Sequence, residues 1–396
     1  MPNDHHQGSV VDQLARPEDL AAGQAASLDA TQEALEDQGP EGLTGDLPDQ
    51  KRGVQGSAVR DQLLRPRTAL SFLLAMVILA VFVTRSDLNL SNIWANIREA
   101  NLGLLAGAFT IYYFTLFLRA VRWRWMLDLA GIGATTDTQL PGAVYLTGVY
   151  TISWLVNCIV PAKLGDAYRA YRVRRDDAVR YSIGFGTIIA ERVFDLVVLV
   201  VMLSASVLLA FHGSLPGQSD TALYIGVAMV VVVTAGMLVM FFFREFIEAR
   251  LPHRFRSHFT LFQQTLFQMV RNPAVPTVFA ITIWFGESLR VYLVSESLGA
   301  GISFELAVFV ALLSALLTTL PFTPAGLGVV EVAIVTALTF VDVPSDVAGS
   351  VAVLDRVITY WSAILIGGIV ALAMMRRSST PGNAVVEAKG PVQSTS

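Results

Sequence analysis

The feature that most constrains this sequence is a series of nine long apolar runs. A helix needs about 20 mainly apolar residues to span the hydrocarbon core of a bilayer, and several runs reach that length. Because lipid offers no partner for backbone polar groups, such runs predict an all-α polytopic membrane protein. The composition agrees, since only 15% of the residues are charged, against about a quarter in soluble domains. The runs are 68–84, 102–119, 142–160, 183–211, 222–243, 275–297, 304–320, 327–341 and 346–375.

The N-terminal part differs from these runs in composition. The whole chain has a net charge of −4 and residues 1–50 carry −10, so the remainder carries +6. Residues 1–60 contain no aromatic residue and cannot bury enough apolar surface to offset their chain entropy. We therefore expect an acidic, disordered cytoplasmic tail over 1–60, a transmembrane domain over 65–377, and a second disordered tail over 378–396.

Several classes of function lack their usual signals. A single cysteine, Cys158, excludes an internal disulfide and a thiolate metal cluster. The sequence contains no nucleotide-binding loop and no histidine pair at metal-ligand spacing, so we expect no metal, no cofactor and no metal-dependent enzyme. No global basic surface is present, so nucleic acid is not an expected partner. Transport by such a chain would be passive or driven by an ion gradient.

The basic residues between the runs predict the topology, because cytoplasmic loops are enriched in Lys and Arg. Run 142–160 has basic segments on both sides, which indicates a hairpin that enters from the cytoplasm and returns. The pair 304–320 and 327–341 has no base at either end, which indicates a hairpin from the other side. These assignments predict six full spans, two opposed re-entrant hairpins (about eight membrane helical segments), and both termini on the cytoplasmic side of the cell (inner) membrane.

The two hairpins also share sequence. Pro161-Ala-Lys-Leu-Gly-Asp166 aligns with Pro324-Ala-Gly-Leu-Gly-Val329, and Glu191-Arg192 aligns with Asp355-Arg356. Because the two halves would point in opposite directions, the pattern predicts an inverted repeat with broken helices, which is typical of a transporter binding site. The residues that we expect to form the two turns are Asn157, Pro161, Gly165, Pro321, Pro324, Gly326 and Gly328.

Four motifs together resemble a known family. They are Asn157-x3-Pro161-Ala-Lys-Leu-Gly-Asp-x-x-Arg169, Glu191-Arg192-x-x-Asp195, Leu320-Pro-x-x-Pro-Ala-Gly-Leu-Gly-x-x-Glu331 and Asp355-Arg356. Over residues 65–377 the chain resembles the flippase-like transmembrane domain of lysylphosphatidylglycerol synthases, with Lys163 where Arg is usual and Ala325 where Gly is usual. The soluble aminoacyl-transferase domain of those synthases has no counterpart in this sequence. The resemblance implies translocation of an anionic lipid and does not extend to lysine transfer.

Charged residues inside the runs are the candidate site residues, since charge inside a membrane is costly and usually faces a cavity or a partner. Arg192, Arg290 and Arg356 are candidates to bind a lipid phosphate, because guanidinium binds phosphate through two hydrogen bonds. Asp166 and Arg169 would contact the headgroup or act only at a helix terminus. The remaining carboxylates would tune the arginines, carry a coupling proton, or form buried ion pairs that lock the two halves together: Glu191, Asp195, Glu287, Glu331 and Asp355.

Two further patterns indicate contact with the membrane surface. Arg119, Arg122, Trp123, Arg124 and Trp125 predict an aromatic and basic belt at the membrane interface. Within 244–272, apolar residues repeat at helical spacing, which indicates an interfacial helix or a helix packed on the bundle.

The sequence thus predicts a membrane protein that moves an anionic lipid or lipid-linked intermediate between leaflets. Membrane lipids are the expected partners. A membrane-embedded lipid-modifying transferase, with Asp166 or Glu331 as base, is a second hypothesis. A third is a non-transporting scaffold that recruits a partner enzyme through the acidic N-terminal tail.

Overall fold

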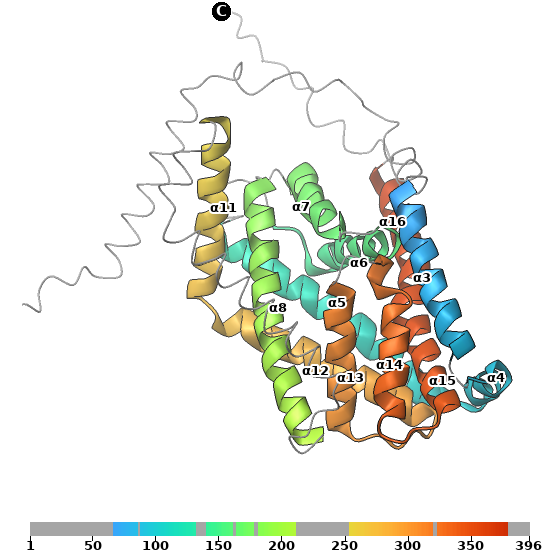
Figure 1. Cartoon of the computed structure of the whole chain (residues 1–396). Coiled ribbons are helices and arrows are strands. Elements are labelled where there is room, and N and C mark those ends of the chain that lie inside the picture. Colours follow the sequence, from blue (N-terminus) through green and yellow to red (C-terminus); the bar gives the residue numbers. More distant parts are fainter. Residues whose placement is uncertain are drawn as a thin grey trace, which may run out of the picture. The chain divides into compact units, whose positions relative to one another are not determined.

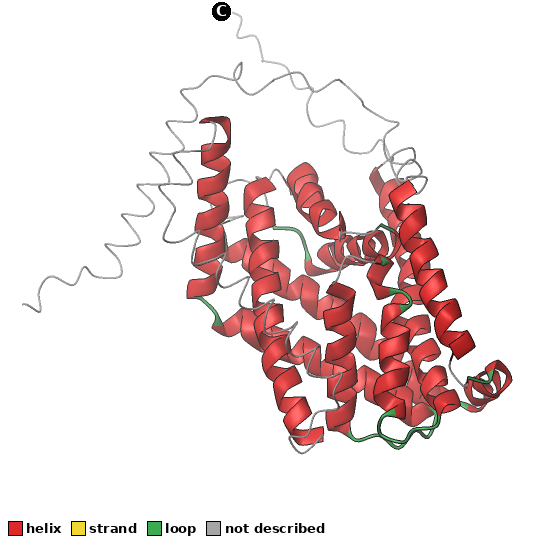
Figure 2. Cartoon of the chain, in the orientation of Figure 1, coloured by secondary structure: helices red, strands yellow, loops and turns green. Residues whose placement is uncertain are grey.

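The computed structural model describes residues 66–85, 88–131, 140–160, 164–177, 181–210, 253–319 and 323–378. These residues form helices and connecting loops and contain no strand (Figure 2). The tail predicted over 1–60, the apolar run 222–243 and residues 379–396 lie outside the described residues.

The helices follow the apolar runs, with additional short helices between them (Figure 1). The elements are α3 (Pro66–Arg85), α4 (Leu90–Glu99), α5 (Leu102–Leu129), α6 (Ala143–Ile159), α7 (Leu164–Asp177), α8 (Tyr181–Ala210), α11 (His253–Arg271), α12 (Ala274–Ser297), α13 (Phe304–Thr319), the 3₁₀ turn η3 (Pro324–Gly326), α14 (Val329–Thr339), α15 (Ser345–Arg356), the π-helical segment η4 (Val357–Trp361) and α16 (Ser362–Ser378).

Local sequence signals account for several helix starts. The side chain of Asn101 accepts hydrogen bonds from the backbone N–H groups of Gly103 and Leu104 at 2.9 and 3.2 Å, which caps α5. Asn89 caps α4 in the same way through Ser91. At α14, the Glu331 carboxylate accepts from the backbone N–H of Gly328 at 2.8 Å. Each cap satisfies donors that the first helical turn leaves free.

Four helical stretches are long and apolar enough to cross a membrane: Leu102–Leu129, Ser182–Ala210, Ala274–Ser297 and Ser345–Arg376. A fifth results if α3 and α4, which are bent by 98° at their junction, form one span. Shorter apolar helices lie between them. The chain is therefore an all-helical, multi-pass membrane protein over the described residues, and the six spans with two opposed hairpins stay a prediction.

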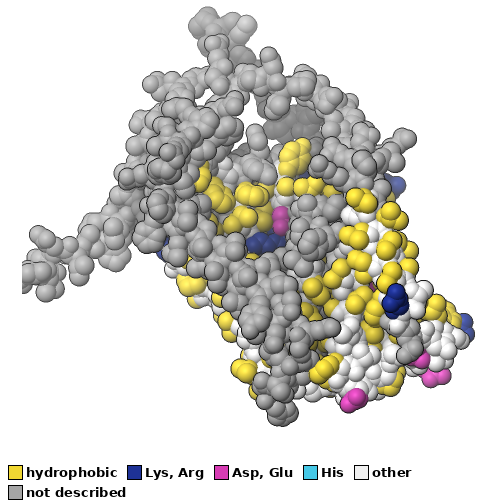
Figure 3. All heavy atoms as spheres, viewed as in Figure 1, with side chains coloured by type: hydrophobic (Ala, Val, Ile, Leu, Met, Phe, Trp, Pro, Cys, Tyr) yellow, Lys and Arg dark blue, Asp and Glu magenta, His cyan; other side chains and the backbone are white. Residues whose placement is uncertain are grey.

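The long helices pack into one helical body. Helices α5 and α12 run along one another, and α6, α8, α13 and α15 with η4 contact this pair (Figure 1). Large apolar side chains on the outer side of α8, such as Leu208 and Leu209, are about two-thirds exposed, as expected for lipid contact. In the space-filling view, acidic and basic atoms gather in a hollow between apolar side chains (Figure 3).

The stripe predicted within 244–272 falls on α11, which packs against α8. Leu266 and Met269 are almost fully buried and lie in a cluster with Met126, Ala190 and Phe194. This part of the stripe therefore packs on the bundle.

Candidate functional site

The first helix break joins α6 to α7. The side-chain oxygen of Asn157, near the end of α6, accepts a hydrogen bond from the backbone N–H of Gly165 at 2.9 Å. A Cβ at residue 165 would lie 2.0 Å from the carbonyl oxygen of Ser153, so only glycine fits this close approach. The break thus positions the first turn of α7, which carries Asp166, while Pro161 lies outside the described residues.

The second break lies between α13 and α14 and has unusual backbone geometry. Pro324 opens the 3₁₀ turn, and Ala325, Gly326 and Gly328 all have positive φ, at 46°, 71° and 86°. Arg356 donates hydrogen bonds to the carbonyl oxygens of Ala325 at 3.4 Å and Gly326 at 3.1 Å. The turn therefore exposes carbonyl groups that one arginine satisfies. Pro321 lies outside the described residues.

A fully buried cluster of charges holds the first half together. Glu191 of α8 contacts Arg122 of α5 at 2.9 Å and Arg169 of α7 at 3.0 Å, and none of these three side chains is exposed. The Tyr150 hydroxyl of α6 also donates to Glu191, and the Arg169 guanidinium lies over the Tyr150 ring. One carboxylate thus ties four helices together.

The neighbouring residues on α8 extend this cluster. Asp195 accepts from Arg122 at 2.6 and 3.0 Å. Arg192 points to Asp166 of α7, with three donor–acceptor distances between 2.7 and 3.1 Å. Asp166 also contacts Arg169 at 3.1 Å.

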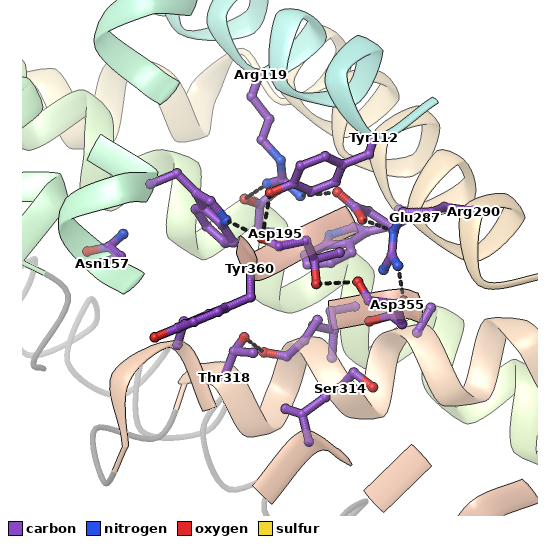
Figure 4. A pocket seen from close by; sticks show the side chains of 18 of the residues that line it. Tyr112, Arg119, Asn157, Asp195, Glu287, Arg290, Ser314, Thr318, Asp355 and Tyr360 are labelled. Carbon is purple, nitrogen blue, oxygen red and sulfur yellow. Dashed lines mark hydrogen bonds and ion pairs between the residues drawn. The ribbon is translucent and has the colours of Figure 1, made fainter. Parts of the chain in front are cut away.

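The second half has its own pairs on α12, α14 and α15. Arg290 pairs with Glu287 on its own helix at 3.2 Å and with Asp355 of α15. Arg356 pairs with Glu331 of α14 at 3.1 Å. Arg119 of α5 lies between the two halves, 3.6 Å from both Asp195 and Glu287 (Figure 4).

The two halves follow the same plan of ion pairs. In each half an acid–arginine dipeptide lies on a long helix, as Glu191-Arg192 or Asp355-Arg356. The acid contacts an arginine of the α5–α12 pair, which is Arg122 or Arg290. The arginine contacts an acid at the start of the helix that follows the break, which is Asp166 or Glu331.

Several of these charged side chains border a cavity of about 330 Å³. Among the described residues, four arginines and four carboxylates line it, together with hydroxyl and aromatic side chains that include Ser314, Thr318 and Tyr360 (Figure 4). The charged lining residues are Arg119, Arg192, Arg290, Arg356, Asp166, Asp195, Glu287 and Asp355. The most exposed of these arginines is Arg192, whose side chain is 27% exposed.

The candidate residues from the sequence divide into two groups. Arg192, Arg290 and Arg356 all border the cavity, whereas Arg169 and Glu191 are buried behind it. Sequence reasoning missed the wall formed by Tyr112, Trp154, Trp284 and Tyr360. Apolar periodicity cannot distinguish such aromatic side chains from ordinary core residues.

The predicted interface belt is wrong for Arg119, Arg122 and Trp123. All three are buried, because α5 continues to Leu129 and turns them toward the protein interior instead of toward headgroups. The two arginines contact carboxylates, and the Trp123 indole N–H donates to the hydroxyl of Thr187 on α8. The spacing of Arg119 and Arg122 matches that of Glu287 and Arg290 on α12, and this shared spacing is the signal that could have found them.

Comparison with known proteins agrees with the motifs. The family model described as the lysylphosphatidylglycerol synthase TM region matches residues 68–367. The chain belongs to this family. The resemblance inferred from the motifs is thereby confirmed, and the matched region contains every charged residue of the cavity.

Two relatives of this chain are described only as membrane proteins. A UPF0104 membrane protein of Methanocaldococcus jannaschii is 32% identical over 219 residues, which are 54% of this chain and 92% of that protein. A UPF0104 membrane protein of Pyrococcus horikoshii is 24% identical over 316 residues, with 70% and 91% covered. The glycosyltransferase AglD of Haloferax volcanii is 32% identical over 164 residues, which are 41% of this chain and 25% of that enzyme.

Proposed function

We propose that this protein moves an anionic lipid or a lipid-linked anionic intermediate between the leaflets of the cell membrane. The observation that carries the proposal is the cavity lined by Arg119, Arg192, Arg290 and Arg356 inside a body of membrane helices. Guanidinium groups bind phosphate through paired, charge-assisted hydrogen bonds, and such charges inside a membrane mark substrate paths. The lipid tails would remain in the bilayer while the headgroup occupies the cavity.

The repeated plan of ion pairs supports an inverted repeat, in which two broken segments enter from opposite sides and meet at the cavity. In transporters of this design, one half moves against the other around a fixed site. Arg119 is suited to a position at the fixed site between the halves, because it contacts a carboxylate of each half. We accordingly propose two opposed hairpins and both termini on the cytoplasmic side.

A membrane-embedded transferase is the second candidate, and the similarity to AglD favours it. The match covers a quarter of that glycosyltransferase, and Asp166 and Glu331 of this chain are both held by arginines. A carboxylate in an ion pair is a weaker base than a free one. The ion pairs therefore favour translocation.

Reconstitution tests the proposal. The full chain is inserted into phosphatidylcholine vesicles that contain fluorescently labelled phosphatidylglycerol, and dithionite then bleaches the label that reaches the outer leaflet. We expect faster translocation than in protein-free vesicles. Arg192→Ala should slow translocation roughly tenfold or more, because a charge-assisted hydrogen bond is worth about 1.5–3 kcal/mol.

Arg271→Ala is the matched control, because Arg271 is exposed at the end of α11, outside the cavity. It should translocate at the wild-type rate. Full activity of Arg192→Ala would contradict the phosphate role of this arginine. No transport of labelled phosphatidylglycerol or of a labelled polyprenyl phosphate by the wild-type chain would contradict translocation itself.

A further inference from the structure

The cavity has no surplus of positive charge. Its four arginines are matched by four carboxylates among the described lining residues, and each arginine lies within 3.6 Å of a carboxylate. A lipid phosphate would arrive as an additional anion in a site with little water. Burial of an uncompensated charge is strongly unfavourable. The unfavourable energy falls if one carboxylate loses its charge as the lipid binds.

Asp166 is the carboxylate best placed for this change. All the described hydrogen bonds of Arg192 go to Asp166, so release of this one carboxylate frees the guanidinium from each of these bonds. Each of the other cavity arginines contacts at least two acceptor groups: Arg119, Arg290 and Arg356. Arg192 is also the most exposed of the four, so a phosphate reaches it first.

We infer that the lipid phosphate replaces Asp166 on Arg192, and that the displaced carboxylate takes up one proton from the bulk solvent, so that no hydroxide is left in the cavity. This inference rests on the proposed function and names the proton as the ion coupled to lipid transport. The proton forms a bond with a carboxylate oxygen of Asp166, and the anion and the proton together leave the charge of the site unchanged. One proton would thus accompany each anionic lipid, and a proton gradient would drive the transport.

The charges around Asp166 determine whether lipid affinity rises or falls with pH. The charged groups that face Asp166 are Arg169 on its own helix and Arg192 and Glu191 on α8. Helix α6 contributes only neutral groups, Asn157 and Tyr150. The Tyr150 hydroxyl is hydrogen-bonded to Glu191. In the free protein two arginines keep the carboxylate ionised. When Arg192 turns to the phosphate, Asp166 loses one cation and gains an anionic neighbour. Protonation then becomes favourable, so lipid affinity must fall as pH rises.

Binding measured at several pH values tests this. The probe is dioctanoylphosphatidylglycerol, a phosphodiester that keeps a single negative charge over the pH range of the experiment. It is titrated into the purified full chain in neutral detergent, with tryptophan fluorescence as the signal, since Trp154 and Trp284 line the cavity. We expect the dissociation constant to rise with pH, approaching tenfold per pH unit where one proton binds with the lipid.

Asp166→Asn should bind the probe more tightly, and its affinity should not change with pH. Asp342→Asn is the matched control, because Asp342 is an exposed carboxylate on the loop between α14 and α15, in a backbone conformation that Asn also tolerates. This variant should keep the wild-type pH dependence.

Each outcome decides a separate point. Wild-type binding that does not vary with pH would overturn the proton coupling and leave translocation standing. A pH dependence that persists in folded Asp166→Asn would overturn the role of Asp166. No binding at any pH would overturn the anion site, and with it both the coupling and the proposed function. The wild-type measurement decides the proton coupling even if the variant does not fold.

Discussion

At the scale of the residue, the charged side chains differ in their position relative to the cavity. Glu191, Arg122 and Arg169 are fully buried, and each contacts at least two charged partners. Arg192 lies at the cavity and has Asp166 as its described partner. We therefore propose that the first group maintains the helical body and that Arg192 binds the substrate.

This assignment predicts opposite phenotypes for two neighbouring residues. Glu191→Gln removes the charge that balances two buried guanidinium groups, and breaking such a buried pair costs about 3–5 kcal/mol. We expect little folded Glu191→Gln protein when the detergent-solubilised sample is heated and then analysed by size-exclusion chromatography. Arg192→Ala should keep a wild-type profile in the same measurement. A Glu191→Gln protein as stable as wild type would contradict the structural role.

The charged residues also indicate what sequence reasoning can and cannot supply. The sequence identified Arg192, Arg290 and Arg356, because charges inside apolar runs are conspicuous. It did not identify Arg122, because that residue follows the apolar part of its run and resembles an interface residue. Its partner carboxylates lie about 70 residues further along the chain, and only the packed helices bring them together.

At the scale of the element, the two helix breaks place the carboxylates that hold the arginines. The first break relies on a glycine at the point where α7 approaches α6, and the motif predicted a turn there. The second break contains Ala325 in the left-handed region, at φ 46° and ψ 33°. The family resemblance expects glycine at this position, and the structure supplies the reason, since the left-handed conformation is strained for alanine.

Ala325→Gly should therefore stabilise the protein by about 1 kcal/mol, because glycine adopts positive φ without strain. The measurement is the apparent melting temperature in detergent, which should rise. Ala337→Gly is the matched control, because Ala337 lies in the regular helix α14, where glycine is unfavourable. A lower melting temperature for Ala325→Gly would contradict the strained turn.

The π-helical segment η4 is an element that the sequence did not indicate. It follows Asp355-Arg356 directly, and its Thr359 and Tyr360 line the cavity. Single π-helical turns inside α-helices occur frequently at functional sites. Here the segment divides a long apolar run that sequence periodicity treats as one regular helix.

At the scale of the whole molecule, an inverted repeat requires its two halves to face opposite sides of the membrane. In a Cys158→Ala background, single cysteines at Asp177, the end of α7, and at Pro344, the exposed residue before α15, report the two sides. An impermeant thiol reagent added to intact cells should label Pro344→Cys and leave Asp177→Cys unlabelled. Labelling of Asp177→Cys from outside would contradict the inverted repeat.

The sequence predicted the helices and the family. The predicted number of spans rests on the charges between the runs, but Arg119 and Arg122, at and just past the end of run 102–119, are buried in ion pairs. Loop charge is a reliable guide only where the bases face water, so Arg124, which is exposed, carries the prediction for that end of α5.

Translocation requires the cavity to be a path across the membrane, so the direct test is whether the cavity can be reached from both sides. Ser314 of α13 lines the cavity, and in a Cys158→Ala background Ser314→Cys places one thiol there. An impermeant reagent is added either to right-side-out or to inside-out membrane vesicles. Ser288→Cys, at a fully buried position of α12, is the unreactive control. Ser314→Cys should react from each side, because a translocation path must open to both. Reaction from one side alone would contradict translocation and favour a site that serves a single leaflet.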